Sequence, residues 1–227
     1  MNYNFNYISN LLKDFYFPDF FCENTFYELN DSSIFEKDFK IFTGCSKLVI
    51  VPPFTDYVIK IPFNCYEDFD ENFNTTYIDF IGAFNDPEAL DCWDYCAKEV
   101  YIYSLSKNYF FNTINPFPET IFFDTINHWP IYLQEKCKSF KSLSFHSSFS
   151  NDELVSTYYT LEKECGSCCS VHSEWLTSYY KRYGLAETSS LLKFLQYYHL
   201  NDFHSDNVGF SNKDNRLVLI DFSGYNE

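Results

Sequence analysis

The chain has 227 residues, including 27 Phe and 20 Tyr, so it is long and apolar enough to bury a sizeable core. Its formal net charge of −16, with no basic block, argues against duplex nucleic acid as the main partner. No run of about 18 apolar residues is present, so we expect no membrane-spanning helix. Residues 1–17 lack a basic start and an unbroken apolar stretch, so we expect no signal peptide and a cytoplasmic location. The nine cysteines are then expected to be reduced thiols.

The sequence pattern changes at Lys40. Residues 1–35 are expected to form one or two short helices. From Lys40 onward, three β-branched or aromatic runs, KIFTG, KLVIVPP and DYVIKIPF, are separated by turn-forming residues. This pattern predicts a three-stranded meander. Residues 64–80 are polar and acidic, and we interpret them as an exposed loop inserted after the meander.

A helix is predicted to begin at Asp86, where a capping Asp precedes Pro and Glu, and to run to about Lys107. One stripe of this helix, at spacings of three and four, is formed by Cys92, Tyr95, Cys96, Ile102 and Tyr103. Glu99 lies inside this stripe, and a buried charge is costly unless it is paired. We therefore expect a partner for Glu99, whereas Asp91 and Asp94 are expected to be ordinary solvent-facing acids.

Two further strands, ETIFF and PIYLQEKC, are predicted before the chain becomes mainly helical. Helices are expected over about residues 151–164, from Ser173 as cap to a stop at Gly184, and over about residues 186–198. The polar stretch LNDFHSDNVGF follows, and the segments VGF and RLVLIDF then form a strand pair around a turn at residues 212–215.

Three polar side chains are expected to converge at this strand pair. Asp202 and Asn207 lie in the loop before it, and Asp221 comes at the end of its second strand. Two carboxylates and an amide oxygen are hard ligands suited to magnesium bound to phosphate oxygens. An Asp that accepts a proton, with an Asn and a second Asp that hold metal, is the arrangement of phosphoryl transfer.

These residues resemble the motifs of the protein kinase superfamily. The spacing from Asp202 to Asn207 is similar to that of the kinase catalytic loop, and the segment DFSG that begins at Asp221 resembles the DFG motif with one extra Ser. His204 makes the loop closer to the D-x-H-x-x-N loop of aminoglycoside-phosphotransferase-like kinases. The resemblance covers about residues 40–224. It implies an α+β, bilobal protein-kinase-like fold with an antiparallel five-stranded N-lobe plus one helix and a reduced, mainly helical C-lobe.

The resemblance also implies a division into domains, and the composition suggests an origin. Residues 1–39 would be an N-terminal extension, residues 40–135 the N-lobe, and residues 136–227 the reduced C-lobe. The small size and the Asn-, Phe- and Tyr-rich composition look like those of a viral or phage protein, which would place it in the host cytoplasm.

The same resemblance implies roles for single residues. Lys60, in the segment VIK of the third strand, is similar to the kinase Lys that contacts the ATP phosphates, and Glu99 matches the Glu that pairs with it. Asp202 is implied as the base, with Asn207 and Asp221 on magnesium. We expect Lys60 and Glu99 to lie within hydrogen-bond distance.

The resemblance implies other nucleotide contacts, in segments that match the kinase motifs less closely. The segment QEKC falls where the hinge that reads adenine would lie, and it suggests contacts from Glu135 and Cys137. The Gly-rich loop over the phosphates departs from G-x-G-x-x-G, since only TGCSK can replace it. Gly44 and Ser46 of that segment are the implied phosphate contacts.

Two further departures bear on control and on the acceptor. Asn201 stands where many kinases have Arg, so we do not expect control by a phosphorylated activation loop. The sequence ends at Glu227, so no activation segment or peptide platform is expected. The apolar surface around Leu192, Leu195 and the LVLI strand is then expected to be incompletely covered. Residues 1–35, or a second copy of the chain in a homodimer, are the expected cover.

A Cys-rich loop is a second candidate site. Three thiols and an imidazole, enough for a tetrahedral zinc site, come from Cys165, Cys168, Cys169 and His172. Zinc sites usually draw ligands from two separated pairs, whereas these four are nearly contiguous. We therefore prefer reduced loop thiols to zinc.

Two functions of different class remain open. The first is an ATP- and magnesium-dependent phosphotransferase with an unidentified protein or small-molecule acceptor. The alternative is a pseudokinase, a nucleotide- or protein-binding module that transfers nothing. Retention of all five polar roles favours the enzyme, and the altered Gly-rich loop favours the pseudokinase. We prefer the enzyme.

Overall fold

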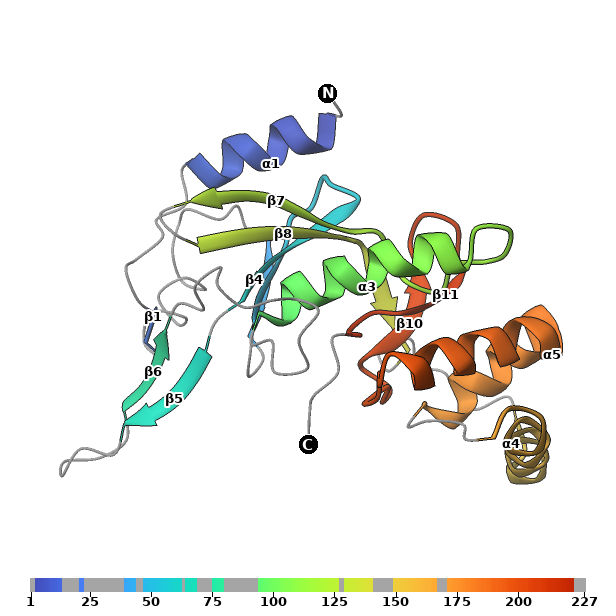
Figure 1. The fold of residues 1–227 in the computed structure, drawn as a ribbon. Coiled ribbons are helices and arrows are strands. Elements are labelled where there is room, and N and C mark those ends of the chain that lie inside the picture. Colours follow the sequence, from blue (N-terminus) through green and yellow to red (C-terminus); the bar gives the residue numbers. More distant parts are fainter. Residues whose placement is uncertain are drawn as a thin grey trace. The chain divides into compact units, whose positions relative to one another are not determined.

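The computed structural model describes residues 3–13, 21–22, 39–43, 47–62, 64–68, 75–79, 94–126, 129–140, 149–166 and 171–222. These residues form an α+β protein with a five-stranded antiparallel sheet and four helices (Figure 1), as the sequence predicts. None of the helices in these ranges is long and apolar enough to cross a membrane. The chain divides into two compact units: unit 1 is Met1–Tyr101 with Thr120–Glu135, and unit 2 is Ile102–Glu119 with Lys136–Glu227.

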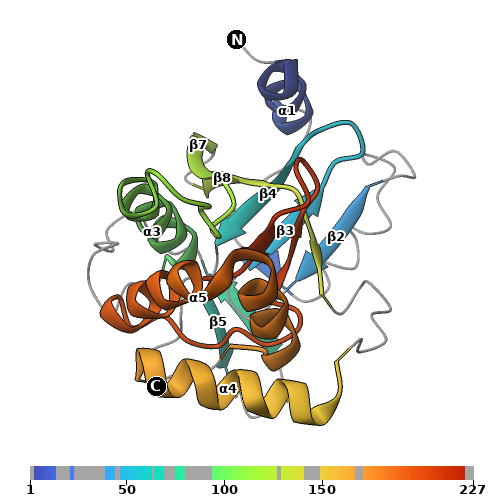
Figure 2. The same cartoon turned by 90° about the vertical axis from the view of Figure 1, so that its right-hand side faces the viewer.

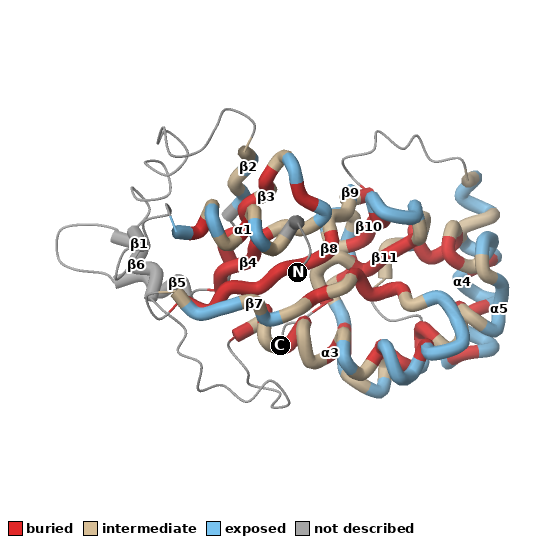
Figure 3. The backbone as a smooth tube through the Cα atoms, turned by 90° about the horizontal axis from the view of Figure 1, so that it is seen from above, coloured by how far each residue is buried: buried red, intermediate tan, exposed pale blue. Residues whose placement is uncertain are grey.

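The five-stranded sheet belongs to unit 1. Its strands are β2 (Lys40–Thr43), β3 (Lys47–Val51), β4 (Tyr57–Pro62), β7 (Thr120–Ile126) and β8 (Trp129–Glu135). They are antiparallel in the order β2-β3-β4-β8-β7, so the predicted meander and the two later strands are confirmed. Strand β8 lies between two neighbours and is buried along its whole length (Figure 3).

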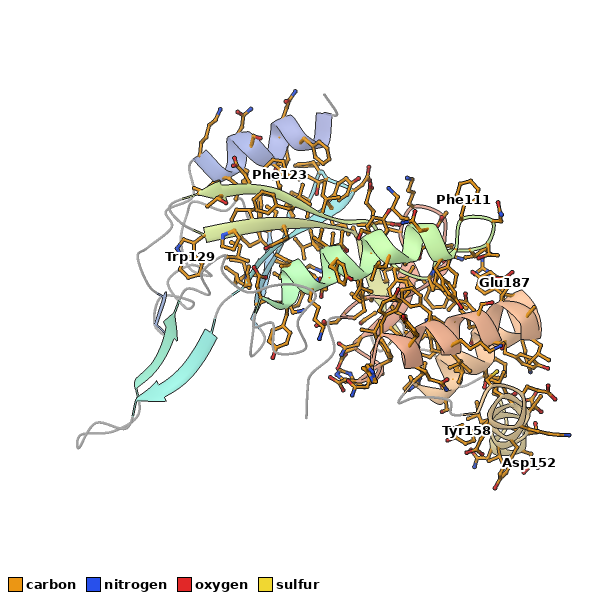
Figure 4. All side chains as sticks on the ribbon, viewed as in Figure 1. Phe111, Phe123, Trp129, Asp152, Tyr158 and Glu187 are labelled. Carbon is orange, nitrogen blue, oxygen red and sulfur yellow. The ribbon has the colours of Figure 1, made fainter. Side chains whose placement is uncertain are left out.

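Helix α1 (Tyr3–Lys13) packs on one face of this sheet (Figure 1). Its buried side chains Ile8 and Leu12 join a core of every second residue on three strands: Leu48, Ile50, Ile59, Ile61, Trp129, Ile131 and Leu133. Side chains alternate between the two faces of a strand, so these residues share one face. Phe123, labelled in Figure 4, lies between β7 and α1, and its ring centroid is 5.9 Å from that of Phe5.

The expected helical segment near the N-terminus is confirmed for residues 3–13, whereas most of residues 14–35 lie outside the described residues. The expectation that this segment covers Leu192 and Leu195 is wrong for α1, which packs within unit 1. The reason is physical: alternate apolar residues give the sheet a continuous apolar face, and an amphipathic helix buries its own apolar stripe there.

Replacing Leu12 with Ala should lower the free energy of unfolding by about 2–5 kcal/mol, because the change leaves a cavity against a packed sheet. Leu12 is buried in this core, whereas Asn6 lies on an exposed position of the same helix. Asn6→Ala is therefore the matched control and should change stability by less than about 0.5 kcal/mol. Chemical denaturation of both variants measures the difference. Two equally small effects would contradict the packing of α1 on the sheet.

The acidic insert forms strands, so the expectation of an exposed loop is wrong. Strands β5 (Asn64–Asp68) and β6 (Thr75–Asp79) pair antiparallel, and β6 also pairs with β1 (Phe21–Cys22). The run TTYI in β6 consists of β-branched and aromatic residues. Their strand preference outweighs the polar composition around them.

Helix α3 (Tyr95–Tyr109) ends close to the predicted position, and its predicted beginning at Asp86 lies outside the described residues. Its first turns belong to unit 1 and its later turns, from Ile102, to unit 2. Glu99 therefore belongs to unit 1, as do β3 and β4.

The helices of unit 2 agree closely with the predicted ones. Helix α4 (Asn151–Cys165) matches the first, and α5 (Ser173–Tyr197) packs beside it (Figure 2). Gly184 interrupts α5 with a φ of 85° and a ψ of 177°. Glycine adopts such a backbone conformation without a steric penalty from Cβ. The predicted stop at Gly184 and the following helix are thus confirmed.

The predicted cap of α5 is wrong by one residue. The N-cap is His172, whose side chain makes no capping hydrogen bond, and Ser173 is the first helical residue. The backbone nitrogen of His172 instead donates to the carbonyl oxygen of Phe203 at 2.8 Å. This bond fixes where the helix begins, which a local capping rule does not anticipate.

Unit 2 also contains a small sheet of β9 (Cys137–Ser139), β10 (Val208–Ser211) and β11 (Leu217–Leu219). Its order is β11-β10-β9, and both pairs are antiparallel. The predicted strand pair around residues 212–215 is confirmed. This pair follows the polar loop and fixes where that loop ends.

Aromatic rings build the core of unit 2. The ring of Phe117 lies 5.2 Å from that of Phe194 and 5.0 Å from that of Phe222. Leu192, Leu195 and all of β11 are buried. The expectation of an incompletely covered apolar surface is therefore wrong at these positions, where the unusual Phe content of the chain supplies packing partners.

Candidate functional site

One face of the five-stranded sheet carries polar side chains. Leu48 and Ile50 face α1, so Lys47 on the same strand points to the opposite face. Lys60 pairs with Tyr132 of β8, and both lie on that opposite face. Charged side chains at these buried positions require partners. The partners come from α3.

Glu99 of α3 accepts hydrogen bonds from two lysines. The Nζ of Lys60 lies 2.9 Å from Oε1 and 2.7 Å from Oε2 of Glu99. The Nζ of Lys47 lies 2.9 Å from Oε1. All three residues are buried: Lys60 is 3% exposed, Lys47 is 5% exposed and Glu99 is 0% exposed. The predicted partner of Glu99 and the predicted Lys60–Glu99 ion pair are therefore confirmed.

The Lys60 ammonium retains hydrogen-bonding capacity. A lysine ammonium has three N–H donors, and two of them can serve the two oxygens of Glu99. Within the described residues, no acceptor other than Glu99 bonds to Lys60. The third N–H of Lys60 is thus available to an anionic ligand.

Lys47, Gln134 and Thr120 are members of this cluster that the sequence analysis did not identify. The Nε2 of Gln134 donates to Oγ1 of Thr120 at 3.1 Å and lies 3.5 Å from Oε2 of Glu99. Lys47 stands at an alternating position of its strand, which is a usable signal once the apolar face is known. Gln134 was assigned only to the hinge segment, but its side chain belongs to this buried cluster.

The expectation that Asp94 faces solvent is wrong. Asp94 is buried, its Oδ1 accepts from the backbone nitrogen of Ala97 at 2.9 Å, and its Oδ2 accepts from the Tyr132 hydroxyl at 2.7 Å. It therefore caps α3 and ties the helix to β8. Burial raises the pKa of the Asp94 carboxyl above its ordinary value, although these hydrogen bonds oppose the shift.

Among the described residues, Cys96 and Cys165 are free thiols. Burial, and then the nearby Glu99 carboxylate, raise the pKa of the Cys96 thiol well above its ordinary value. A thiol held in its protonated form is a poor nucleophile.

In unit 2 the polar loop has an unusual backbone at Asp202. Asp202 has a φ of 66°, in the left-handed region that non-glycine residues seldom adopt. Its neighbour Phe203 is fully buried and bridges to Val171. In the part of the chain that the structure describes, no hydrogen bond or ion pair engages the Asp202 carboxylate. The loop thus holds a partly exposed, unpaired carboxylate in a fixed position.

Asn207 links the loop to the strand that precedes Asp221. Its Nδ2 donates to the backbone oxygen of Asp202 at 2.9 Å. Its own backbone oxygen accepts from the nitrogen of Ile220 at 2.8 Å. These two bonds bring Asn207 next to the backbone of Asp202 and of Ile220, the residue before Asp221, whereas the convergence of the three side chains stays a prediction.

His204 is exposed in the same loop. Its Nδ1 accepts from the backbone nitrogen of Asp206 at 3.2 Å, so the neutral ring carries its proton on Nε2. The Asp206 carboxylate lies 3.9 Å away. His204 therefore closes the turn of the loop.

Several predicted site residues are not tested by these contacts. Gly44 and Ser46, the expected phosphate contacts, lie outside the described residues. Glu135 ends β8 and Cys137 begins β9, and their contacts with a nucleotide stay predictions.

The zinc prediction is also untested. Cys165 is the last residue of α4 and His172 precedes α5, whereas Cys168 and Cys169 lie outside the described residues. Among the residues that are described, no group of three or more His, Cys, Asp or Glu side chains could hold a metal ion. The Nδ1 of His172 is buried without a hydrogen-bond partner there.

Comparison of the chain with protein-family models, with curated proteins and with solved structures gave no match.

Proposed function

We propose that the protein is an ATP- and magnesium-dependent phosphotransferase with a bilobal, kinase-like fold. In this proposal unit 1 is the N-lobe and unit 2 is the reduced C-lobe. The buried Lys60–Glu99 pair is the observation that supports it most. The two residues are 39 positions apart, and no local rule would pair them. The resemblance to kinases singles out these two residues from the sequence.

Lys60 would bind the phosphates of ATP. Glu99 fixes the ammonium by contacts to both carboxylate oxygens and leaves the third N–H available. A rigid, desolvated donor stabilises phosphate charge more strongly than a mobile surface lysine. This is positioning and electrostatic work, which is the main protein contribution to phosphoryl transfer.

The loop of unit 2 fits a magnesium site by its donor set. The Nδ2 of Asn207 donates to the loop backbone, which leaves Oδ1 of the same amide as an available oxygen ligand. Asp221 would supply the carboxylate oxygen. Both are hard oxygen donors of the kind magnesium prefers. Bound magnesium would neutralise charge on the phosphates.

Asp202 would act as the base. Its carboxylate would accept the proton of the acceptor hydroxyl as the hydroxyl oxygen bonds to the terminal phosphorus and ADP leaves. The unpaired state of this carboxylate among the described residues suits that role. The acceptor is a hydroxyl of a protein or a small molecule.

The metal assignment predicts a thermal shift that depends on Asp221. ATP with Mg²⁺ at 100 times its Kd should raise the melting temperature of the wild type by about 5–10 °C. Asp221→Ala should abolish the rise without unfolding the protein. Asp152→Ala, an exposed Asp of α4, is the control and should keep it. An equal rise in Asp221→Ala would refute the assignment.

Transfer of phosphate from labelled ATP, to the protein itself or to proteins and small molecules of a host lysate, separates the two functions. Transfer that depends on Lys60 supports the enzyme. A thermal shift without transfer favours the pseudokinase, for which the same clusters would hold a nucleotide as a binding module.

A further inference from the structure

Helix α4 exposes large apolar side chains that the proposed function does not use. Val155 is 53% exposed and Tyr159 is 65% exposed, and Tyr158 is exposed as well. Single exposed apolar residues are normal on a protein surface, whereas a group of them marks an interaction site. We propose that this side of α4 binds a basic segment of a partner protein that also carries apolar side chains. This inference does not depend on the proposed function.

The exposed apolar side chains lie on the side of α4 that is turned away from the core of unit 2. Val155 and Tyr159 each stand two positions before a buried residue, and two positions correspond to a turn of about 200° around the helix axis. The buried residues are Thr157, Leu161 and Cys165. Figure 2 shows α4 at the outside of unit 2, with α5 along one side of it. We call the exposed apolar side the α4 patch, which consists of Val155, Tyr158 and Tyr159.

The two tyrosines of the α4 patch form a continuous aromatic surface. The ring centroid of Tyr158, labelled in Figure 4, lies 6.5 Å from that of Tyr159, and the rings meet edge to face. Val155 precedes Tyr158 by three positions and Tyr159 by four, so all three are neighbours on the helix surface. The patch therefore offers an aliphatic side chain and two rings to one partner.

The remaining exposed surface of α4 is polar. Ser156 donates from its hydroxyl to the carbonyl oxygen of Glu153 at 3.1 Å, and Thr160 donates to that of Ser156 at 2.8 Å. The exposed apolar residues of this helix are thus gathered on one side of it. A helix whose exposed surface served only solvation would not need such a separation.

Acidic side chains stand at both ends of the α4 patch. Asp152 precedes Val155 by three positions, and Glu162 follows Tyr159 by three. Within the described part of the chain, neither of these two carboxylates forms an ion pair. The helix contains four acidic residues and one basic residue, Lys163. The patch therefore combines apolar surface with a net negative charge.

This charge selects a basic partner. Lys and Arg side chains of a partner would pair with Asp152 and Glu162 and lie over the tyrosine rings, while its apolar side chains would cover Val155. The formal net charge of −16 of the whole chain would speed the encounter with such a segment. A second copy of the chain that met this one through the same patch would instead place like charges opposite one another, which is unfavourable.

The test uses a synthetic amphipathic peptide of Leu and Lys as the probe and measures its binding by fluorescence anisotropy. The wild type should bind this peptide at least about tenfold more tightly than matched peptides in which Gln replaces Leu or Glu replaces Lys. Val155→Ser and Tyr159→Ser should each weaken binding of the probe by about tenfold or more. Phe111→Ser is the control and should leave binding unchanged, because Phe111 is an exposed apolar residue of unit 2 outside the α4 patch.

Several results would overturn the proposal. They are absence of binding to the wild type, equal binding of the probe by Tyr159→Ser and the wild type, and equal affinity for the peptide in which Gln replaces Leu. Sedimentation velocity tests the other occupant. A dimer of the wild type that Tyr159→Ser converts to a monomer would assign the patch to a second copy of the chain and overturn the assignment to a basic partner.

Discussion

Glu99→Gln should lower the free energy of unfolding by about 3–5 kcal/mol, the usual cost of removing one partner from a buried ion pair. The substitution keeps the size and shape of the side chain and removes its charge. Two buried ammonium groups, those of Lys47 and Lys60, then lose the carboxylate that they share. A change of this size is a large share of the stability of an ordinary domain.

Lys60→Met should cost less than Glu99→Gln, because the carboxylate keeps Lys47 as a partner and the methionine fills most of the vacated space. The structure thus predicts an asymmetry between two partners of one ion pair. In a simple one-to-one pair, removing either partner would strand one charge. Here removal of the acid affects two charges, and removal of one base strands none.

The control for these variants is an ion pair of equal length on the surface. Lys181 and Glu153 are also 2.7 Å apart, but each side chain is 46% exposed. Lys181→Met should leave stability nearly unchanged, since water and mobile ions already screen the pair. Urea denaturation of the three variants measures all effects together. Equal losses for Glu99→Gln and Lys60→Met would contradict the sharing of Glu99 by two lysines.

The five-stranded sheet was predictable because its strands carry strong local signals. Alternating β-branched residues and intervening turn residues marked KIFTG, KLVIV and YVIKIP before any contact was known. The same rules failed for residues 64–80, where acidic and amide residues conceal two strands. Pairing with a partner strand stabilises such a segment, and a single-sequence pattern does not contain the partner.

Part of the polar cluster in unit 1 was predictable and part was not. Glu99 was identifiable because a charge inside an apolar helical stripe requires a partner, and Lys60 was its expected partner. Lys47 required the strand register, which sets Lys47 and Lys60 on one face of neighbouring strands. Asp94 was misjudged because the helix begins immediately after it, which makes it a buried cap instead of a solvent-facing acid.

The loop of unit 2 was easier to predict from the sequence, because the residues that contact one another in it are only a few positions apart. Asn207 bonds to the backbone of Asp202, five residues before it. Asp221 follows a strand pair whose turn is marked by Asn and Asp. The left-handed backbone of Asp202 was not predictable, since aspartate adopts this conformation only where its surroundings impose it.

Under the proposed function, Asp202→Asn should lower turnover by about 10²-fold or more while nucleotide affinity stays nearly intact. The asparagine amide cannot accept the acceptor proton as a carboxylate does, so the loss falls on the chemical step. The variant should fold normally. Asparagine has the same shape as aspartate and is among the residues that best tolerate a left-handed backbone such as the φ of 66° at this position.

Asp206→Asn is the matched control for this prediction because it makes the same chemical change four residues later in the same loop. Asp206 is exposed, its backbone nitrogen donates to Nδ1 of His204 at 3.2 Å, and its carboxylate lies 3.9 Å from the same ring nitrogen. A general loss of negative charge in the loop would slow both variants alike. A base at Asp202 slows only the first, and it does so without weakening ATP binding in a titration. Equal turnover in Asp202→Asn and the wild type would remove Asp202 from the mechanism. An equal loss of turnover in Asp202→Asn and Asp206→Asn would mean that Asp202 contributes only its negative charge and does not act as the base.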